Sequence, residues 1–361
     1  MRQLPFLVLV ALLFSCRSQD LPGNERFGNG LVLPKSWLKN SDTLYTPLKH
    51  RRPPDQTFLT FPEWFLVFSP EEQAAFLREQ PAHRFRYQQH LHQLWGSYQI
   101  MKDQIRGNYP YNLGYHFMIK VIAISTTLEY GFRSMYEKTI GRFSSKLNRH
   151  RLTDEDRFHA AYMQDYVDFI KVRPWYEYNF YGQLPDLWKL DFRDGNPVRK
   201  LERRLFLSSE LLFKAAYGIL ITGGTKTAYE EALPNTLCVV ENSPDLDSLQ
   251  YPEFKKIQAI RDGMTVVSLP RYDLFKDYAG EICRKGGKFR EIAGNTAAIL
   301  VSIISPSPKL EIPGCQLVFA QELASFPGNR RFVLAIPVQG LHLVLLECDR
   351  QNLKIEHIFD Y

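Results

Sequence analysis

Two segments of the chain repeat one pattern of residues that could carry acid–base chemistry. The pattern is Glu-x-x-Phe-basic-x-x-Tyr, and its two occurrences are Glu129, Phe132, Arg133, Tyr136 and Glu210, Phe213, Lys214, Tyr217. In both, the glutamate precedes its basic partner by four residues, which is the favourable order for an ion pair on a helix. Two interpretations stay open. Either these are salt bridges that fix two packed helices, or Glu129 and Glu210 face a shared cavity in which one carboxylate is held protonated.

Further candidates are scattered along the chain. Asp165 is the next carboxylate to consider, because it lies in an otherwise apolar helical row. His116, at the start of a predicted helix, is either a satisfied core residue or a ligand-binding residue. The candidates for ligand binding are His116, Tyr130, Arg133, Trp175, Tyr176, Glu177, Lys214, Tyr217, Glu356 and His357. We expect the Trp175-Tyr176-Glu177 loop to cover the glutamate pair, whereas Glu356 and His357 lie on the last predicted strand, as ligand contacts or as exposed strand residues.

Several chemistries are disfavoured by the sequence. It contains no G-x-S-x-G or H-E-x-x-H motif, and no Glu-x-x-His pair of a di-iron bundle. His83, His90 and His92 have no carboxylate or cysteine at ligand spacing, so we expect neither a metal nor another cofactor. The net charge of +6 is small, and the aromatic content of 14% indicates stacked cores or a groove for a small apolar ligand. We expect no binding to nucleic acid.

These residues must be positioned by helices in the first part of the chain. In the segment 109–142, apolar side chains recur at helical spacing, and we interpret it as the buried central helix of an all-α domain over residues 57–228. Lys120 and Glu129 argue against a membrane span. Other helices are predicted from Ser69-Pro70 to near Pro81, over 85–106, from the Thr153 cap to about Val172, and from Asn196-Pro197 to about Ile221.

Residues 235–361 show a different periodicity. Hairpin, helix and strand follow one another twice, with an Asp262-Gly263 turn of type I′ in the first hairpin. Pro270 and Pro337 occupy equivalent places, as do Cys283 and Cys348, which could pair or be small buried thiols. The sequence therefore predicts an α+β protein: an all-α domain followed by a duplicated domain, with one antiparallel sheet and two helices on a face.

In its order of elements, this C-terminal part resembles the duplicated fold of the effector-binding domains of multidrug-sensing regulators and of the haem-binding SOUL proteins. The resemblance implies a cleft between the halves that takes a small apolar or cationic ligand. A plain ferredoxin-like sheet is the alternative.

The N-terminus reads as an export signal. Residues 1–15 have a basic start and a short apolar core, and Leu13-Phe14-Ser15-Cys16 resembles the lipobox of bacterial lipoproteins. That resemblance implies cleavage before Cys16 and lipid on Cys16; an ordinary cleaved signal is the alternative. Arg17, in place of a retention aspartate, favours the periplasmic side of the outer membrane. Residues 16–56 lack periodicity and are predicted to be the attachment site and a flexible tether.

The mature chain also resembles an uncharacterised group of bacterial envelope proteins through the TFPEW, EYG and PWYE segments that begin at Thr60, Glu129 and Pro174. The leading hypothesis is a lipid-anchored periplasmic binding or scaffolding protein without catalysis. One alternative is an envelope enzyme that uses Glu129 and Glu210. The other is a sensor of a small ligand in the C-terminal cleft. The sequence names no protein partner.

Overall fold

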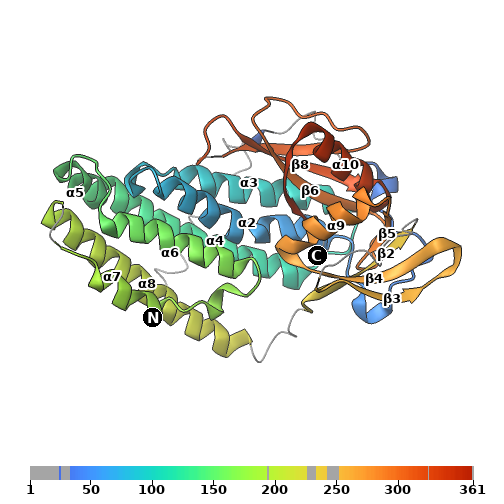
Figure 1. Cartoon of the computed structure of the whole chain (residues 1–361), viewed down its shortest axis with the longest axis horizontal. Helices are drawn as coiled ribbons and strands as arrows, with labels where there is room; N and C mark the ends of the chain where they lie inside the picture. Colours follow the sequence, from blue (N-terminus) through green and yellow to red (C-terminus); the bar gives the residue numbers. More distant parts are fainter. Residues whose placement is uncertain are drawn as a thin grey trace.

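The computed structural model describes residues 33–192, 195–225, 233–241, 252–323 and 325–359, and a short strand at 24–25. Of residues 24–25 and 220–225 only the backbone is described. The fold is α+β, with a helical region followed by two antiparallel sheets (Figure 1), which confirms the predicted fold class. The predicted signal peptide over 1–15 and Cys16 lie outside the described residues.

The helical region is a group of long helices that run side by side (Figure 1). Its α-helices are α2 (Gln56–Leu77), α3 (Tyr87–Ile105), α4 (Leu113–Tyr136), α5 (Arg142–Leu147), α6 (Asp154–Ile170), α7 (Leu184–Lys189) and α8 (Pro197–Thr225). The predicted cap at Thr153 is confirmed, because Thr153 forms a capping box with Asp156. At the start of α4, the Asn112 side chain accepts from the Tyr115 amide.

Helix α2 begins earlier than the sequence predicts. It runs through Pro62 and Pro70, although an interior proline removes a hydrogen bond and costs roughly 3 kcal/mol. The aromatic side chains over residues 58–68 of this helix are 7% exposed or less, so their burial offsets that cost; they are Phe58, Phe61, Trp64, Phe65 and Phe68. Ser69, predicted as a cap, is a buried interior residue that contacts His90 and Tyr130.

Helix α4 presents a different face to the core from the one predicted. The apolar row expected to be buried is largely exposed, with Phe117 at 64%, Phe132 at 62% and Met135 at 61%. The residues that face the protein are Ile119, Ala123 and Tyr130 together with His116, Arg133 and Ser134. The predicted helical periodicity is confirmed, but the side assigned to the core is wrong.

The C-terminal part is duplicated, as predicted. Strands β2 (Asn235–Glu241), β3 (Lys255–Ala259), β4 (Met264–Pro270), helix α9 (Phe275–Arg284) and strand β5 (Lys288–Ile292) form the first repeat. Strands β6 (Ala298–Ser305), β7 (Gln316–Glu322), β8 (Arg330–Pro337), helix α10 (Leu341–Gln351) and strand β9 (Lys354–Ile358) form the second. Pro270 and Pro337 close equivalent strands. Asp262 and Gly263 take the positive φ angles, 62° and 73°, that a type I′ turn requires.

The prediction of a single sheet was wrong. Each repeat forms its own sheet, in the orders β3-β4-β2-β5 and β7-β8-β6-β9, and β1 (Asn24–Glu25) is added beside β7. The sequence analysis missed β2, which is the first strand of the first repeat. Both sheets and both helices contribute to one continuous core, which includes Cys283 and Cys348. Both thiols are free, and burial raises the pKa of each to about 12.

Each sheet also packs against a segment from the first part of the chain. Helix α2 packs on β6, where the Thr57 hydroxyl donates to the Phe359 carbonyl at 2.9 Å and accepts from the Leu300 amide at 3.0 Å. Leu33 and Leu38 pack with α2 and the second sheet, and residues 40–52 lie against β5 and the turn after it, where the amides of Tyr45 and Thr46 donate to the Glu291 carboxylate at 2.6 and 2.9 Å. The prediction of a flexible tether therefore does not hold for residues 33–55. In the part of the chain that the structure describes, no helix is long and apolar enough to cross a membrane.

Candidate functional site

The two repeated Glu-basic motifs meet in the structure. Helices α4 and α8 run side by side, and Arg133 Nη2 contacts Glu129 Oε1 at 3.2 Å and Glu210 Oε1 at 2.6 Å. Lys214 Nζ lies 3.3 and 3.4 Å from the same two oxygens. We call these four residues the α4–α8 charge cluster. The sequence repeat thus marked a real contact, in which both glutamates share both basic residues.

The electrostatics of this cluster disfavour a protonated carboxylate. Burial by itself would raise the pKa of Glu210, but the charges of Arg133 and Lys214 outweigh it and the pKa is strongly lowered. The Tyr162 hydroxyl also donates to Glu210. Glu210 is therefore ionised at neutral pH and does not hold a proton ready for transfer.

One wall of the charge cluster is aromatic. Lys214 Nζ lies 5.5 Å from the ring centre of Tyr166 and 5.7 Å from that of Phe180. Trp175 stacks on Tyr217, with ring centres 5.3 Å apart, and the Tyr217 hydroxyl lies 3.3 Å from Ser125 Oγ of α4. The predicted aromatic loop therefore does pack over this end of the helix pair.

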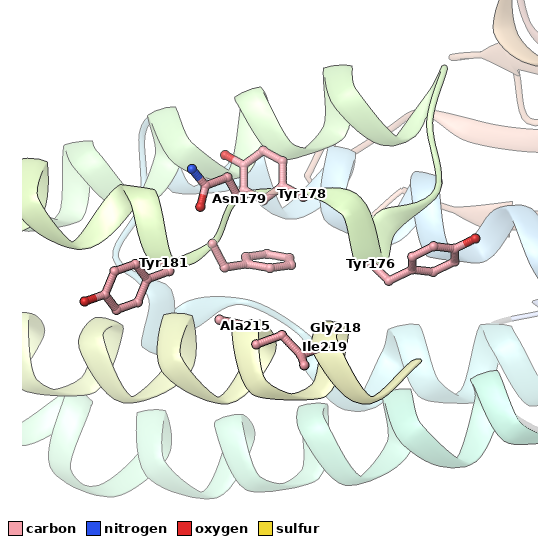
Figure 2. Close-up of a pocket in the computed structure, with 8 residues that line it drawn as sticks. Tyr176, Tyr178, Asn179, Tyr181, Ala215, Gly218 and Ile219 are labelled. Carbon is pink, nitrogen blue, oxygen red and sulfur yellow. The ribbon is translucent and has the colours of Figure 1, made fainter. Parts of the chain in front are cut away.

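A small pocket opens between that loop and α8 (Figure 2). Its volume is about 300 Å³, and its lining is Tyr176, Tyr178, Asn179, Phe180, Tyr181, Ala215, Gly218 and Ile219. Phe180 lines the pocket, and the Lys214 ammonium lies on its ring, so the pocket and the cation share this residue. An apolar lining with a few polar groups is typical of a small-ligand site. Of the predicted binding residues, only Tyr176 lines this pocket.

Beyond the charge cluster, α8 carries a buried ionic network that sequence reasoning missed. Arg203 Nη1 contacts Glu137 Oε1 at 2.8 Å and its Nη2 contacts Glu202 Oε1 at 2.6 Å. Arg199 joins Glu202 to Asp156, and its side chain is fully buried. The nearby arginines lower the pKa of Glu202 to about 2 against the effect of burial. The signal in the sequence was the run 199–205, in which the charged residues are buried and the two leucines, Leu201 and Leu205, are exposed.

The remaining helical candidates lie elsewhere. Asp165 is exposed and accepts from the Tyr178 hydroxyl at 2.5 Å, and Glu177 is exposed. His116 is buried, with its Nδ1 2.9 Å from the Tyr98 hydroxyl and its ring stacked on Tyr111. Tyr130 is buried, and its hydroxyl lies 2.8 Å from Ser69 Oγ. These contacts make His116 and Tyr130 satisfied core residues.

Glu356 and His357 are not exposed strand residues, and they do not line an open cleft. Glu356 pairs with buried Arg331 at 2.6 Å, and Arg331 reaches Glu72 of α2 at 3.0 Å. His357 is 1% exposed and its ring centre lies 3.7 Å from that of Trp64. Both side chains therefore belong to the contact between the second sheet and the helices.

A Ser–His–Glu arrangement also escaped the sequence analysis. Ser69 Oγ lies 2.8 Å from His90 Nδ1, and His90 Nε2 lies 3.5 Å from Glu72 Oε2. Ser69 and His90 are at most 1% exposed, and burial lowers the pKa of His90 to about 3. A base this weak, with no access for substrate, cannot activate a serine. We interpret these residues as a polar contact within the core.

Among the described residues, no group of three or more His, Cys, Asp or Glu side chains could hold a metal ion. Comparison of the chain with protein-family models, with curated proteins and with solved structures finds no significant match. The functional argument therefore depends on the geometry of the chain itself.

Proposed function

We propose that this protein is a lipid-anchored, non-catalytic binding or scaffolding protein of the bacterial envelope, facing the periplasm from the outer membrane. The observation that carries the non-catalytic part is the α4–α8 charge cluster. Its two carboxylates, the best acid–base candidates in the sequence, share two cations, and Glu210 stays ionised.

The binding part of the proposal is supported by the pocket beside this cluster. Its tyrosine and phenylalanine lining suits a small apolar, ring-shaped ligand, and the nearby Lys214 ammonium favours an electron-rich ring or a polar edge.

The pocket can be tested with a matched pair of substitutions. Ala215 lines the pocket and Ala216, the next residue, is exposed on the outside of α8. Titration calorimetry with indole as probe is expected to give binding heat for the native chain and for Ala216→Trp, and none for Ala215→Trp. Equal heats for the two variants, or no heat for the native chain, would refute a ligand role for this pocket.

The anchor rests on the resemblance of residues 13–16 to a lipobox and has its own test. Cells that produce the chain are fed labelled palmitate, and the label is expected on the native protein but not on a Cys16→Ala variant. Label that persists in the variant would count against lipid on Cys16. Recovery of the native protein in the outer-membrane fraction tests the compartment.

An envelope enzyme that uses Glu129 and Glu210 stays the second candidate, because the structure brings both carboxylates onto one arginine nitrogen. It requires that Glu129→Gln abolish an activity while leaving the fold intact. The sensor hypothesis has less support, since Glu356 and His357 are buried against the helices.

A further inference from the structure

Helix α8 is inverted in polarity. The side chains of Arg199, Lys200 and Arg203 are fully buried, while Leu201 is 45% exposed and Leu205 is 53% exposed. From Val198 to Ile219 every exposed residue is uncharged. A helix on the surface of a protein in water normally shows the reverse arrangement. The outer side of α8 is therefore built to meet an apolar partner.

Helix α4 has the same inversion. No exposed residue between Leu113 and Tyr136 is charged, and the largest exposed side chains are Phe117, Leu128, Phe132 and Met135. The polar residues His116 and Arg133 face the protein instead. This is the face that the sequence analysis took for a buried core.

The two apolar sides form one surface. Contacts pair Glu129 with Lys214 and Arg133 with Glu210, so the helices are neighbours that run in opposite directions. Phe132 on α4 and Phe213 on α8 each lie directly before the basic residue of their pair, and they are 62% and 69% exposed. We call this surface the outer α4–α8 face. Monomeric proteins rarely expose apolar patches above a few hundred Å² unless something binds there.

The surface continues into α5 and there acquires a basic border. Ile140, Phe143 and Leu147 are exposed, at 52%, 64% and 43%. Exposed basic residues flank this apolar row; they are Lys138, Arg142, Lys146, Arg149 and Arg151. The stretch from 138 to 153 contains no aspartate or glutamate. Basic side chains beside an apolar row are typical of helices that lie in the headgroup region of a bilayer.

We propose that the outer α4–α8 face rests on a bilayer that contains anionic phospholipid, with the apolar side chains at the boundary of headgroups and acyl chains and the α5 border among the phosphates. The charges select this occupant over a second copy of the chain. Two copies face to face would set the basic border against itself or against a face without any exposed acid. Anionic headgroups supply the missing negative charge.

This inference goes beyond the proposed function, because it depends on α4, α5 and α8 and not on lipid at Cys16. It is tested on the full chain with Cys16→Ala, so that no acyl chain contributes. The N-terminal segment is the same in every variant, and any binding that it provides is common to all of them.

The experiment measures sedimentation with phosphatidylcholine vesicles, alone and with about 30% phosphatidylglycerol. Leu205→Asp and Phe132→Asp place a charge on the face. Leu343→Asp and Phe326→Asp are the controls, at residues that are 52% and 50% exposed on the C-terminal part. The double variant Arg142→Glu, Lys146→Glu reverses part of the border, and Lys309→Glu, Lys354→Glu is its control. Circular dichroism and thermal unfolding establish that each variant is folded.

Both face variants are expected to bind the anionic vesicles about ten-fold less than their controls, and the border variant to lose the preference for anionic over neutral vesicles. Equal binding by face and control variants would overturn the proposal, and so would equal binding of the parent chain to neutral and anionic vesicles. A dimer in light scattering that Leu205→Asp separates would also overturn it, since a second copy would then occupy the face.

Discussion

Arg133 is the residue on which the contact between α4 and α8 depends most. Its side chain is 3% exposed and bridges Glu129 and Glu210, the latter 8% exposed. Removal of one member of a buried pair leaves an uncompensated charge, which costs about 3 to 5 kcal/mol.

We therefore expect Arg133→Met to lower the free energy of unfolding by about 3 kcal/mol or more in urea titrations. Lys214→Met should cost less, because Lys214 is more exposed and lies farther from both carboxylates. Combining Arg133→Met with Glu210→Gln should recover part of the loss. A loss below about 1 kcal/mol for Arg133→Met would mean that the pair is solvated.

His159 couples the fold to pH. It is fully buried, neither ring nitrogen has a hydrogen-bond partner among the described residues, and burial lowers its pKa to about 3. In the unfolded chain the imidazole binds a proton below about pH 6.5, whereas the folded protein does not. Its contribution to stability is therefore complete above that pH and is lost progressively as the pH falls toward 3.

Native protein should lose about 1 kcal/mol of unfolding free energy through His159 between about pH 6.5 and pH 5.5. His159→Phe, which keeps a ring against Tyr162, should show a decline that is shallower by this amount. Urea titrations at the two pH values measure the difference. Parallel curves for His159→Phe and native protein would refute the assignment.

Sequence reasoning found the four members of the charge cluster because both pairs are local, with each glutamate four positions before its basic partner. It missed Tyr162 and His159 because their contacts with α8 cross between helices that are about 50 residues apart in the chain. A helical wheel of α6 alone places Tyr162 and His159 on the apolar side of that helix, where nothing marks them as partners of a charged residue.

At the scale of elements, the end of α4 depends on one glycine. A π-helical turn, Glu137–Gly141, joins α4 to α5. A Cβ atom at Gly141 would lie 2.3 Å from Glu137 Oε2, whose carboxylate is held by Arg203. A Cβ atom at Gly131, within α4, would meet no neighbouring atom within 4 Å.

We expect opposite effects from one substitution at these two positions. Gly141→Ala should lower the free energy of unfolding by about 1 to 3 kcal/mol, because it displaces a paired and buried glutamate. Gly131→Ala should raise it by about 0.5 to 1 kcal/mol through helix propensity. Urea titrations of both variants measure these two changes in unfolding free energy. A stabilising Gly141→Ala would show that Glu137 moves away without cost.

Local sequence patterns predicted the positions of most helices and strands, but they predicted less well which side of a helix faces the core. Turn residues and alternation located β3 to β9, apolar periodicity located α4, and the Thr153 cap located α6. The apolar row of α4 identified a helix, but periodicity alone cannot say whether the apolar face of that helix contacts the rest of the protein. The absence of β2 from the sequence analysis had a larger effect, since it merged two sheets into one.

At the scale of the whole molecule, the helices and the second sheet share a core. Phe58, Phe61 and Trp64 of α2 pack with Leu300, Phe319 and Val333 of the sheet. Arg331 adds a buried ionic link from the sheet to Glu72. Because neither part buries its apolar face without the other, we expect the two to unfold together.

The distribution of two residue types allows a test. All five tryptophans lie between residues 37 and 188, and the four cysteines other than Cys16 lie beyond residue 237. In a Cys16→Ala chain, tryptophan fluorescence follows the helices and thiol labelling follows the sheets. The two urea midpoints should coincide, and Arg331→Met should lower both by the same amount. Midpoints that separate would show two independent units.

The placement of residues 33–57 has a consequence for biosynthesis. Asn40, Tyr45 and Thr46 find their partners at 291–297, and Thr57 finds its partners at Leu300 and Phe359. A ribosome makes this early segment hundreds of residues before the strands that receive it. Residues 33–57 can therefore reach their native contacts only after the last strand has been synthesised. A stop codon ahead of β9 would remove binding partners of this N-terminal segment as well as the C-terminal strand.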